Sequence, residues 1–135
     1  MILSEPANAA TRARRFGAEV RMQATVGSDS EWKVLPGLSD ERCVSFEARD
    51  QPGFFLRHSS LEVRSEPYDA TAEFAGNATF CYRAPFEGTD WVFFSIESWD
   101  EPGHFVIRAN DTVSLAPLGD TSAFRSAATW AVRQP

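Results

Sequence analysis

Residues 44–58 read VSFEARDQPGFFLRH, and fifty positions later residues 94–108 read FSIESWDEPGHFVIR. The two stretches keep a Ser, a Glu, an Asp, a Pro-Gly pair and a Phe at the same offset. The register continues without a gap to Arg83 and Arg133, and on the way Ala-Thr-aromatic recurs at residues 78–80 and 128–130. A constant offset of this kind indicates that the chain is built from copies of one supersecondary unit.

A third, more divergent copy precedes these two. Residues 14–21 resemble residues 57–64, and residues 29–32 resemble residues 77–80. The first copy is shorter between these landmarks by about five residues. Residues 8–15 have high helix propensity, but their place in the repeat assigns them to a strand.

Each copy is predicted to form four short strands, at residues 44–48, 54–58, 61–64 and 78–82 in the second copy. The first two strands are separated by Asp50–Gly53, whose residue types favour a turn. A four-stranded unit of this size cannot bury its apolar face alone. Three units related by pseudo-threefold symmetry can close a barrel and cap it, whereas a linear solenoid leaves two open ends.

The predicted fold class is therefore all-β: a β-trefoil of about twelve strands with almost no α-helix. Residues 1–135 form one domain, with lobes at about residues 1–42, 43–91 and 92–135. Apolar positions alternate with polar ones along the strands, as in half-buried sheets. The residues predicted to point inward are Ala13, Val20, Trp32, Phe46, Leu56, Val63, Phe74, Phe80, Ile96, Val106, Val113, Phe124 and Trp130.

Composition excludes several functional classes. The net charge of −6 disfavours nucleic acid and anionic membranes as partners. No apolar run reaches the length of a membrane span, and no signal peptide is visible in the first residues. The two histidines, His58 and His104, are too few and too far apart for a metal site. No phosphate loop, dinucleotide fingerprint or nucleophile elbow occurs, so we expect no cofactor and no intrinsic catalysis. We also expect a monomer.

The two cysteines, Cys43 and Cys81, fit no zinc or redox motif. One interpretation is two buried free thiols. In a trefoil lobe, however, the start of the first strand lies near the end of the fourth, so a Cys43–Cys81 disulfide is geometrically allowed. Such a bond suits an exported module, whereas a cytoplasmic protein would keep both thiols reduced.

The stretch from Val44 to His58, together with Phe74 and residues 77–80, resembles the arabinose-binding (AbfB) domain of α-L-arabinofuranosidase B, the family forty-two carbohydrate-binding module. Repeats of that family contain a Ser-Phe/Leu-x-Ser strand, an Asn-Tyr-Pro-like turn, Tyr-Leu-Arg-His and then Asp-Ala-Thr-Phe. The resemblance extends over about residues 5–133 and itself implies a β-trefoil.

The resemblance also implies a function. The family binds arabinofuranosyl side chains of arabinoxylan or arabinan, and any catalysis lies in a separate glycoside hydrolase domain. The chain would then act in L-arabinose metabolism, and would be secreted if it is part of a larger glycosidase. The alternative is a scaffold or protein-interaction trefoil whose sugar pockets have decayed.

The family's polar anchors are the His of Leu-Arg-His and the Asp of Asp-Ala-Thr-Phe. The second lobe has His58 and, at the Asp position, Asn77, with Phe54 and Phe55 as candidates for the surface that faces the sugar ring. This lobe is therefore the predicted sugar site, and the resemblance predicts that Asn77→Asp strengthens binding.

The other lobes depart further from the family pattern, and they supply only weaker candidates. Arg108 takes the His position in the third lobe, where Ala127 replaces Asp. The first lobe has Asp29 but carries Arg15 at the His position. No lobe combines the family's His and Asp.

Each candidate also has a structural interpretation. His58 shares strand parity with Leu56, so it can be a hydrogen-bonded interior residue. Asn77 precedes a predicted strand, where Asn often closes a turn with its own backbone. Trp99, just before a turn, is either a sugar-stacking platform or a cap over the barrel rim.

Overall fold

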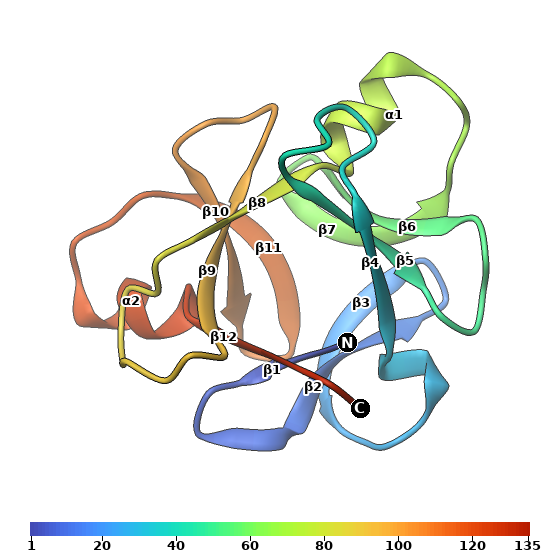
Figure 1. Cartoon of the computed structure of the whole chain (residues 1–135). Helices are drawn as coiled ribbons and strands as arrows, with labels where there is room; N and C mark the ends of the chain where they lie inside the picture. Colours follow the sequence, from blue (N-terminus) through green and yellow to red (C-terminus); the bar gives the residue numbers. More distant parts are fainter.

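The computed structural model describes residues 1–135 and contains twelve short strands, two α-helices and one 3-10 turn. The order strand, strand, strand, helical turn, strand occurs three times along the chain (Figure 1). The elements are β1 (Ile2–Glu5), β2 (Asn8–Phe16), β3 (Glu19–Ala24), η1 (Ser28–Ser30), β4 (Trp32–Pro36), β5 (Val44–Ala48), β6 (Phe54–Ser59), β7 (Glu62–Pro67), α1 (Ala72–Asn77), β8 (Phe80–Arg83), β9 (Phe93–Ser98), β10 (His104–Ala109), β11 (Thr112–Pro117), α2 (Ser122–Ala127) and β12 (Trp130–Arg133).

Six of the strands form a closed ring. They follow one another in the order β1, β12, β9, β8, β5 and β4 through antiparallel pairings. The ring closes between β4 and β1, because Trp32 N–H donates to the Met1 carbonyl at 2.8 Å and the Met1 amino group donates to the Trp32 carbonyl at 2.5 Å. Figure 1 shows the two termini side by side at this seam. The predicted all-β class is confirmed, and the ring leaves no free edge.

The other six strands form three hairpins, β2–β3, β6–β7 and β10–β11, which also pair with one another. The register of β6–β7, from Phe54 opposite Pro67 to Ser59 opposite Glu62, recurs fifty residues later in β10–β11. Residues 8–15, predicted to be a strand despite their helix propensity, lie within β2. The repeat in the sequence is thus also a repeat of strand register.

The recurring Ser of the repeat has a structural explanation. Ser45 and Ser95 are both fully buried, and each Oγ donates to the carbonyl of an Ala 33 residues later, Ala78 or Ala128, at 2.7 Å. A buried hydroxyl needs such a partner, because an unsatisfied one costs about 1–3 kcal/mol. In the second and third repeats, these bonds tie the first strand to the residue that follows the short helical segment.

Two short helices were not predicted. Each has six residues and begins after a Thr whose Oγ1 accepts a hydrogen bond from the N–H three residues on, Thr71 from Phe74 and Thr121 from Phe124, both at 3.1 Å. Because α1 extends to Asn77, the second repeat's last strand begins at Phe80, two residues later than predicted. No helix of the structure has the length and apolar composition needed to cross a membrane.

The helices also move two predicted core residues. Phe74 on α1 packs with Phe55 and Ala78 in a separate apolar cluster. Phe124 on α2 contacts Phe86 and Phe105, with ring centroids 5.4 and 6.4 Å away. The prediction that Phe74 and Phe124 join the central core is wrong, because each lies on a helix outside the ring.

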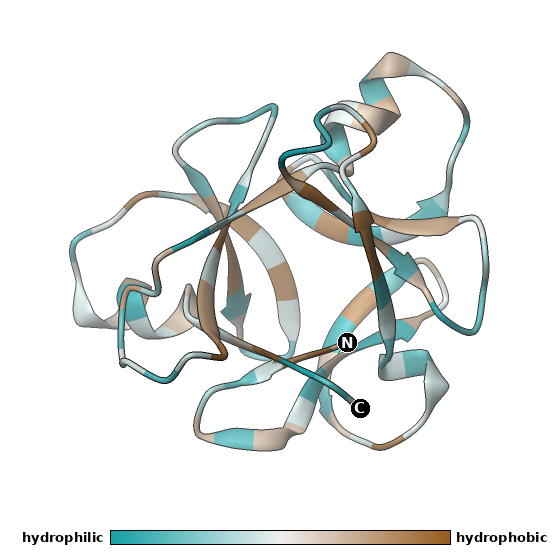
Figure 2. Cartoon of the chain, in the orientation of Figure 1, coloured by the Kyte–Doolittle hydropathy of each residue, from teal (hydrophilic) through white to brown (hydrophobic).

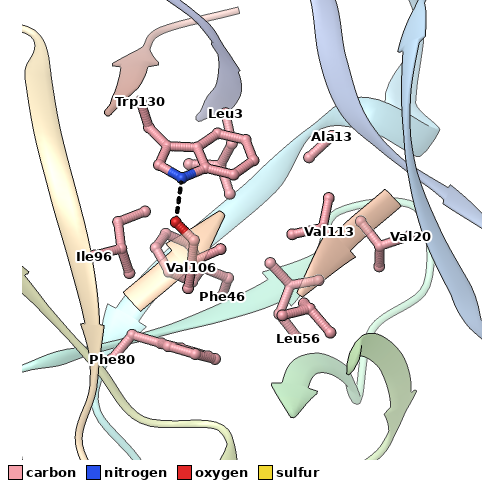
Figure 3. A pocket seen from close by; sticks show the side chains of 11 residues that line it. Leu3, Ala13, Val20, Phe46, Leu56, Phe80, Ile96, Val106, Val113 and Trp130 are labelled. Atoms are coloured by element: carbon pink, nitrogen blue, oxygen red, sulfur yellow. Dashed lines mark hydrogen bonds between the residues drawn. The ribbon is translucent and has the colours of Figure 1, made fainter. Parts of the chain in front are cut away.

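The central core fills the ring. The other predicted inward residues all belong to one buried cluster, which also contains Leu3, Met22, Ala48, Leu115 and Val132. Figure 3 shows part of this cluster, whose side chains converge on an apolar interior, and the Trp130 indole N–H donates to the Val106 carbonyl at 3.0 Å. The most hydrophobic segments lie mainly on the strands, and the loops are mostly hydrophilic or neutral (Figure 2). The interior is therefore filled by the packed apolar core, and a polar binding site has to lie on the surface.

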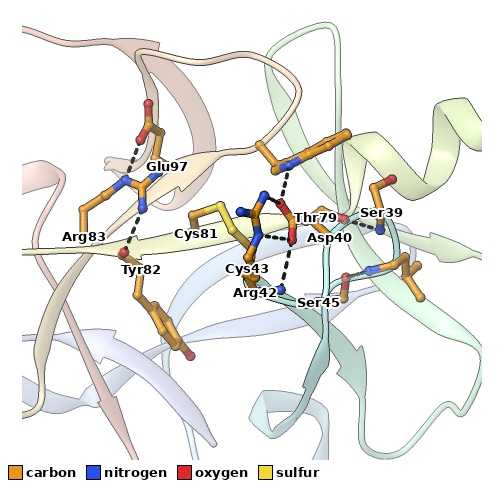
Figure 4. The surroundings of a disulfide bond; sticks show 12 residues. Ser39, Asp40, Arg42, Cys43, Ser45, Thr79, Cys81, Tyr82, Arg83 and Glu97 are labelled. Atoms are coloured by element: carbon orange, nitrogen blue, oxygen red, sulfur yellow. Dashed lines mark hydrogen bonds and ion pairs between the residues drawn. A yellow bond between two sulfur atoms is a disulfide. The ribbon is translucent and has the colours of Figure 1, made fainter.

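Cys43, just before β5, and Cys81, within β8, are joined by a disulfide with their Cα atoms 4.6 Å apart. They come together because β5 and β8 pair at Val44 and Phe80. Figure 4 shows the bond next to Asp40 and Arg42 of the preceding loop.

Candidate functional site

A polar surface groove lies where the β6–β7 hairpin meets the end of α1. It is lined by residues 57–61 of the hairpin, by Glu73 and Asn77 of α1, and by Glu101 of the turn after β9. The groove therefore contains His58 and Asn77, the two polar residues predicted to anchor a sugar. Its other side chains are polar too, apart from Leu61.

The residue that connects His58 and Asn77 is Asp100, for which no role was predicted from the sequence. His58 Nε2 lies 2.6 Å from Asp100 Oδ1, and Asn77 Nδ2 donates to Asp100 Oδ2 at 2.8 Å. Ser98 Oγ donates to Oδ1 at 3.0 Å. Asp100 belongs to the following repeat, so only the folded ring brings it to His58.

Asn77, the last residue of α1, bridges a cation and a carboxylate. Its Oδ1 accepts from Arg57 Nη2 at 2.5 Å while its Nδ2 donates to Asp100. Its side chain thus bonds neighbouring elements, rather than closing a turn with its own backbone.

The carboxylate of this site comes from the following repeat, and the amide comes from the same repeat as His58. The site thus combines one carboxylate with one amide beside the imidazole. The Asp-Glu-Pro-Gly turn was the available sequence signal, but which repeat it would face could not be read from it.

The Asp100 carboxylate remains charged near neutral pH. Burial would raise its pKa, but hydrogen bonds from His58 and Asn77 outweigh burial and lower the pKa below its ordinary value. A carboxylate has about four acceptor positions. Three are used by protein donors, and the side chain is 24% exposed, so the carboxylate retains acceptor capacity.

His58 combines both interpretations that its strand parity left open. Only 7% of the residue is exposed, and it is held by Asp100, so it is an interior histidine. It also lines the groove. An imidazole can donate or accept a hydrogen bond. The bond of Nε2 to Asp100 holds the His58 ring in place beside the groove.

Phe54 and Phe55 do not line the groove. Phe55 is 6% exposed and packs in the cluster of Phe74, and Phe54 packs against the central core. Phe55 is therefore buried in the apolar cluster, and Phe54 is part-buried outside the groove.

The apolar surface of the groove is Leu61. It is 49% exposed and sits in the tight turn between β6 and β7 with φ of 65°. Positive φ is unfavourable for a bulky residue, so the fold holds Leu61 in a conformation that Gly or Asn would adopt more easily.

The equivalent positions of the other repeats carry guanidinium groups. Arg15, equivalent to His58 in the first repeat, pairs with Asp50 at 2.7 Å. Asp29, a weaker candidate, pairs instead with Arg14 at 2.7 Å. Arg15 and Asp29 thus have separate partners and do not pair with each other.

Arg108, at this position in the third repeat, is also internally bonded. Its Nη1 and Nη2 donate to the carbonyls of Thr129 and Ser126, and its guanidinium lies 4.9 Å from the Trp130 ring centroid. Burial lowers the pKa of Arg108, while the charges of Glu5 and Glu87 act to raise it. Arg108 therefore has its hydrogen-bonding capacity largely used within the protein.

Trp99 lies beside the groove. It is 39% exposed, its Nε1 donates to Asp40 Oδ2 at 3.2 Å, and it packs on Gly76 of α1. Its neighbour Asp100 is the centre of the polar site.

Comparison with known proteins gives a consistent family. The model of the alpha-L-arabinofuranosidase B (ABFB) domain matches residues 8–132. Alpha-L-arabinofuranosidase B of Aspergillus niger is 39% identical over 64 residues, 47% of this chain and 13% of that protein. Alpha-L-arabinofuranosidase of Hypocrea jecorina is 39% identical over 59 residues, 44% of this chain and 12% of that protein.

Solved structures share the fold. An arabinofuranosidase complexed with arabinofuranosyl-alpha-1,2-xylobiose superposes with a TM-score of 0.83 at 23% identity, covering 96% of this chain and 30% of that chain. A mosquitocidal holotoxin superposes with a TM-score of 0.72 at 11% identity, covering 96% and 16%. The chain thus spans less than a third of the length of these proteins.

Proposed function

This chain belongs to the alpha-L-arabinofuranosidase B (ABFB) domain family, and from this premise we propose that it is a non-catalytic carbohydrate-binding module for arabinofuranosyl groups. The groups would be the side chains of plant polysaccharides such as arabinoxylan or arabinan. Catalysis would belong to another domain, since the chain matches only 13% of the length of the Aspergillus niger enzyme.

We further infer that the closed ring with its three hairpins is a β-trefoil, with lobes at about residues 1–42, 43–91 and 92–135. The recurring element order and the mutual pairing of the three hairpins support this. On this assignment each sugar position lies where one lobe meets the turn of the next.

The observation that carries the proposed function is the hydrogen-bonded cluster of His58, Asp100 and Asn77, of which His58 and Asn77 line the groove. A furanose presents several neighbouring hydroxyl groups, which donate well to a charged carboxylate and exchange bonds with an imidazole. Glu73 and Glu101 add negative charge to the groove, which suits neutral hydroxyl donors and disfavours anionic sugars. Leu61 offers the C–H face of the sugar an apolar surface.

Titration calorimetry with methyl α-L-arabinofuranoside and arabinofuranosyl oligosaccharides tests the proposal. We expect weak binding by the wild type, because a monosaccharide offers few atoms and ordering it costs free energy. His58→Ala should lower the affinity by about tenfold or more, since it removes an imidazole that lines the groove and one of the three groups that hold Asp100. Arg15→Ala is the matched control, because it removes the equivalent side chain of the first repeat, and its affinity should equal that of wild type.

One observation favours a second candidate, a scaffold or protein-interaction trefoil. Guanidinium groups occupy two of the three equivalent positions and are bonded internally. Failure of the wild type to bind any arabinofuranosyl ligand would favour this candidate, and unchanged binding by His58→Ala would place the sugar site elsewhere.

A further inference from the structure

Trp99 is unusually exposed for a tryptophan in a small globular domain. The residue is 39% exposed, whereas tryptophans are highly buried on average. The equivalent residue of the second repeat is Arg49, so the fold does not require an indole at this position. Trp91 is more exposed still, at 87%, so what distinguishes Trp99 is that its ring is held in place at the border of the groove.

The Trp99 ring is nevertheless firmly held. Its Nε1 donates to Asp40 Oδ2 at 3.2 Å, and its backbone N–H donates to the Thr79 carbonyl at 3.0 Å. Hydrogen bonds from Arg42 lower the pKa of Asp40 to about 2, so this acceptor stays charged. Asp40 also holds the residue that forms the disulfide, because Cys43 N–H donates to the Asp40 carbonyl at 3.0 Å (Figure 4). With its one polar atom bonded, the exposed part of the indole is carbon surface.

The ring is adjacent to the groove. A Cβ built on Gly76 would lie 3.6 Å from Trp99 Cζ3 and 3.3 Å from Asp100 Oδ2, so both side chains lie against the same point of α1. The next residue of the helix, Asn77, lines the groove, and so does Glu101. Trp99 and Asp100 thus lie against the helix residue next to Asn77, at the border of the groove.

We propose that Trp99 is a second subsite, which stacks on the pyranose that carries the arabinofuranosyl group. This inference rests on the proposed function and names its substrate class: arabinofuranosyl groups on a xylopyranose main chain, in preference to those on arabinan. A xylopyranose with equatorial hydroxyls presents a flat face of C–H bonds, which matches an indole, whereas a furanose is smaller and puckered. Because the ring is already fixed, stacking costs little side-chain entropy.

The test compares two ligands, methyl α-L-arabinofuranoside and an arabinofuranosyl xylobiose, by titration with calorimetric and tryptophan-fluorescence readouts. Wild type should bind the larger ligand more tightly. Trp99→Ala should remove this advantage, about tenfold in affinity, and leave the affinity for methyl arabinofuranoside unchanged. Trp99→Phe should recover part of the advantage. Trp91→Ala is the matched control, because Trp91 is 87% exposed, and it should behave as wild type.

The outcomes separate this inference from the proposed function. If Trp99→Ala binds the xylobiose ligand as wild type does while His58→Ala does not, the second subsite is refuted and the furanose site stands. If Trp99→Ala weakens both ligands equally, Trp99 acts within the furanose site and the second subsite is again refuted. If wild type binds neither ligand, both proposals fall. Equal affinity of wild type for an arabinan oligosaccharide and the xylobiose ligand would overturn the assigned preference.

Discussion

Asn77→Asp is predicted to destabilise the protein, although it restores the residue that the family pattern has at this position. The new carboxylate would lie where Asn77 Nδ2 now donates to Asp100 Oδ2 at 2.8 Å. Two unit charges 4 Å apart repel by about 4 kcal/mol at the effective dielectric of a protein surface. Arg57, bonded to the other atom of the Asn77 amide at 2.5 Å, offsets part of this. We expect a net loss of about 1–3 kcal/mol at pH 7 and weaker sugar binding, the reverse of the sequence-based expectation.

The double variant that exchanges the carboxylate and the amide between positions 77 and 100 provides the decisive comparison. Asp100→Asn alone makes two amides meet and leaves one donor facing another, at a cost of about 1–3 kcal/mol. In the double variant Asn77→Asp/Asp100→Asn, the amide at position 100 can donate to the carboxylate at 77 while its oxygen still accepts from His58. The double variant should therefore be close to wild type in stability, which makes the two substitutions strongly non-additive.

Urea denaturation of the four proteins at pH 7 measures this coupling. The pH dependence gives an independent sign. Two close carboxylates raise the pKa of one of them above its unfolded value, so the Asn77→Asp single variant should regain stability relative to wild type as the pH falls toward 4. A single variant as stable as wild type at pH 7, or a double variant no more stable than the worse single variant, would refute the contact between Asn77 and Asp100.

Three other predictions concern stability. The Cys43–Cys81 bond closes a loop with a sequence separation of 38, so replacing both residues by Ser should lower the free energy of unfolding by about 3–4 kcal/mol, measured by urea denaturation. Added reductant should lower the stability of the wild type and leave that of the Ser variant unchanged. Leu61→Gly should relieve the positive φ and raise stability by up to about 1 kcal/mol while weakening sugar binding; a lower stability with intact binding would contradict the role given to Leu61. The pKa of Asp100 is lower in the folded protein, so its contribution is present above pH about 4 and is lost at lower pH, a loss that the stability profile of Asp100→Asn should lack.

Much of the fold could be predicted because the repeat is a property of the residues themselves. Equivalent strands bury equivalent residues, so the offset of fifty residues places the same inward positions in two repeats, and Phe46 and Ile96 both lie in the core. The helices could not be predicted in this way. Six residues give too weak a periodicity, and the caps Thr71 and Thr121 are informative only once a helix is suspected.

The site was predictable in proportion to how local its contacts are. His58 and Asn77 belong to one repeat, and their motif marks them. Asp100 lies in the next repeat and faces His58 only after the ring has closed, so no spacing within one repeat reveals it. Phe54 and Phe55 resemble residues of a motif, but the packing of the strand and of α1 decides which way they face.

Arg15 and His58 occupy equivalent positions, and each bonds a carboxylate of the following repeat. The form of this bond decides which of the two positions suits a sugar ligand. Arg15 contacts both oxygens of Asp50, Nη2 to Oδ2 at 2.7 Å and Nε to Oδ1 at 3.4 Å. A bidentate guanidinium of this kind pairs both oxygens of the carboxylate with one permanently charged partner. At Asp100 the donors are His58 and Ser98 on one oxygen and the neutral amide of Asn77 on the other, and no guanidinium bonds this carboxylate directly. Asp100 therefore keeps its charge available to a sugar hydroxyl, whereas the charge of Asp50 is paired with Arg15. His58→Arg should accordingly preserve the fold yet abolish binding, and sugar binding by this variant, measured by calorimetry beside circular dichroism, would contradict the explanation.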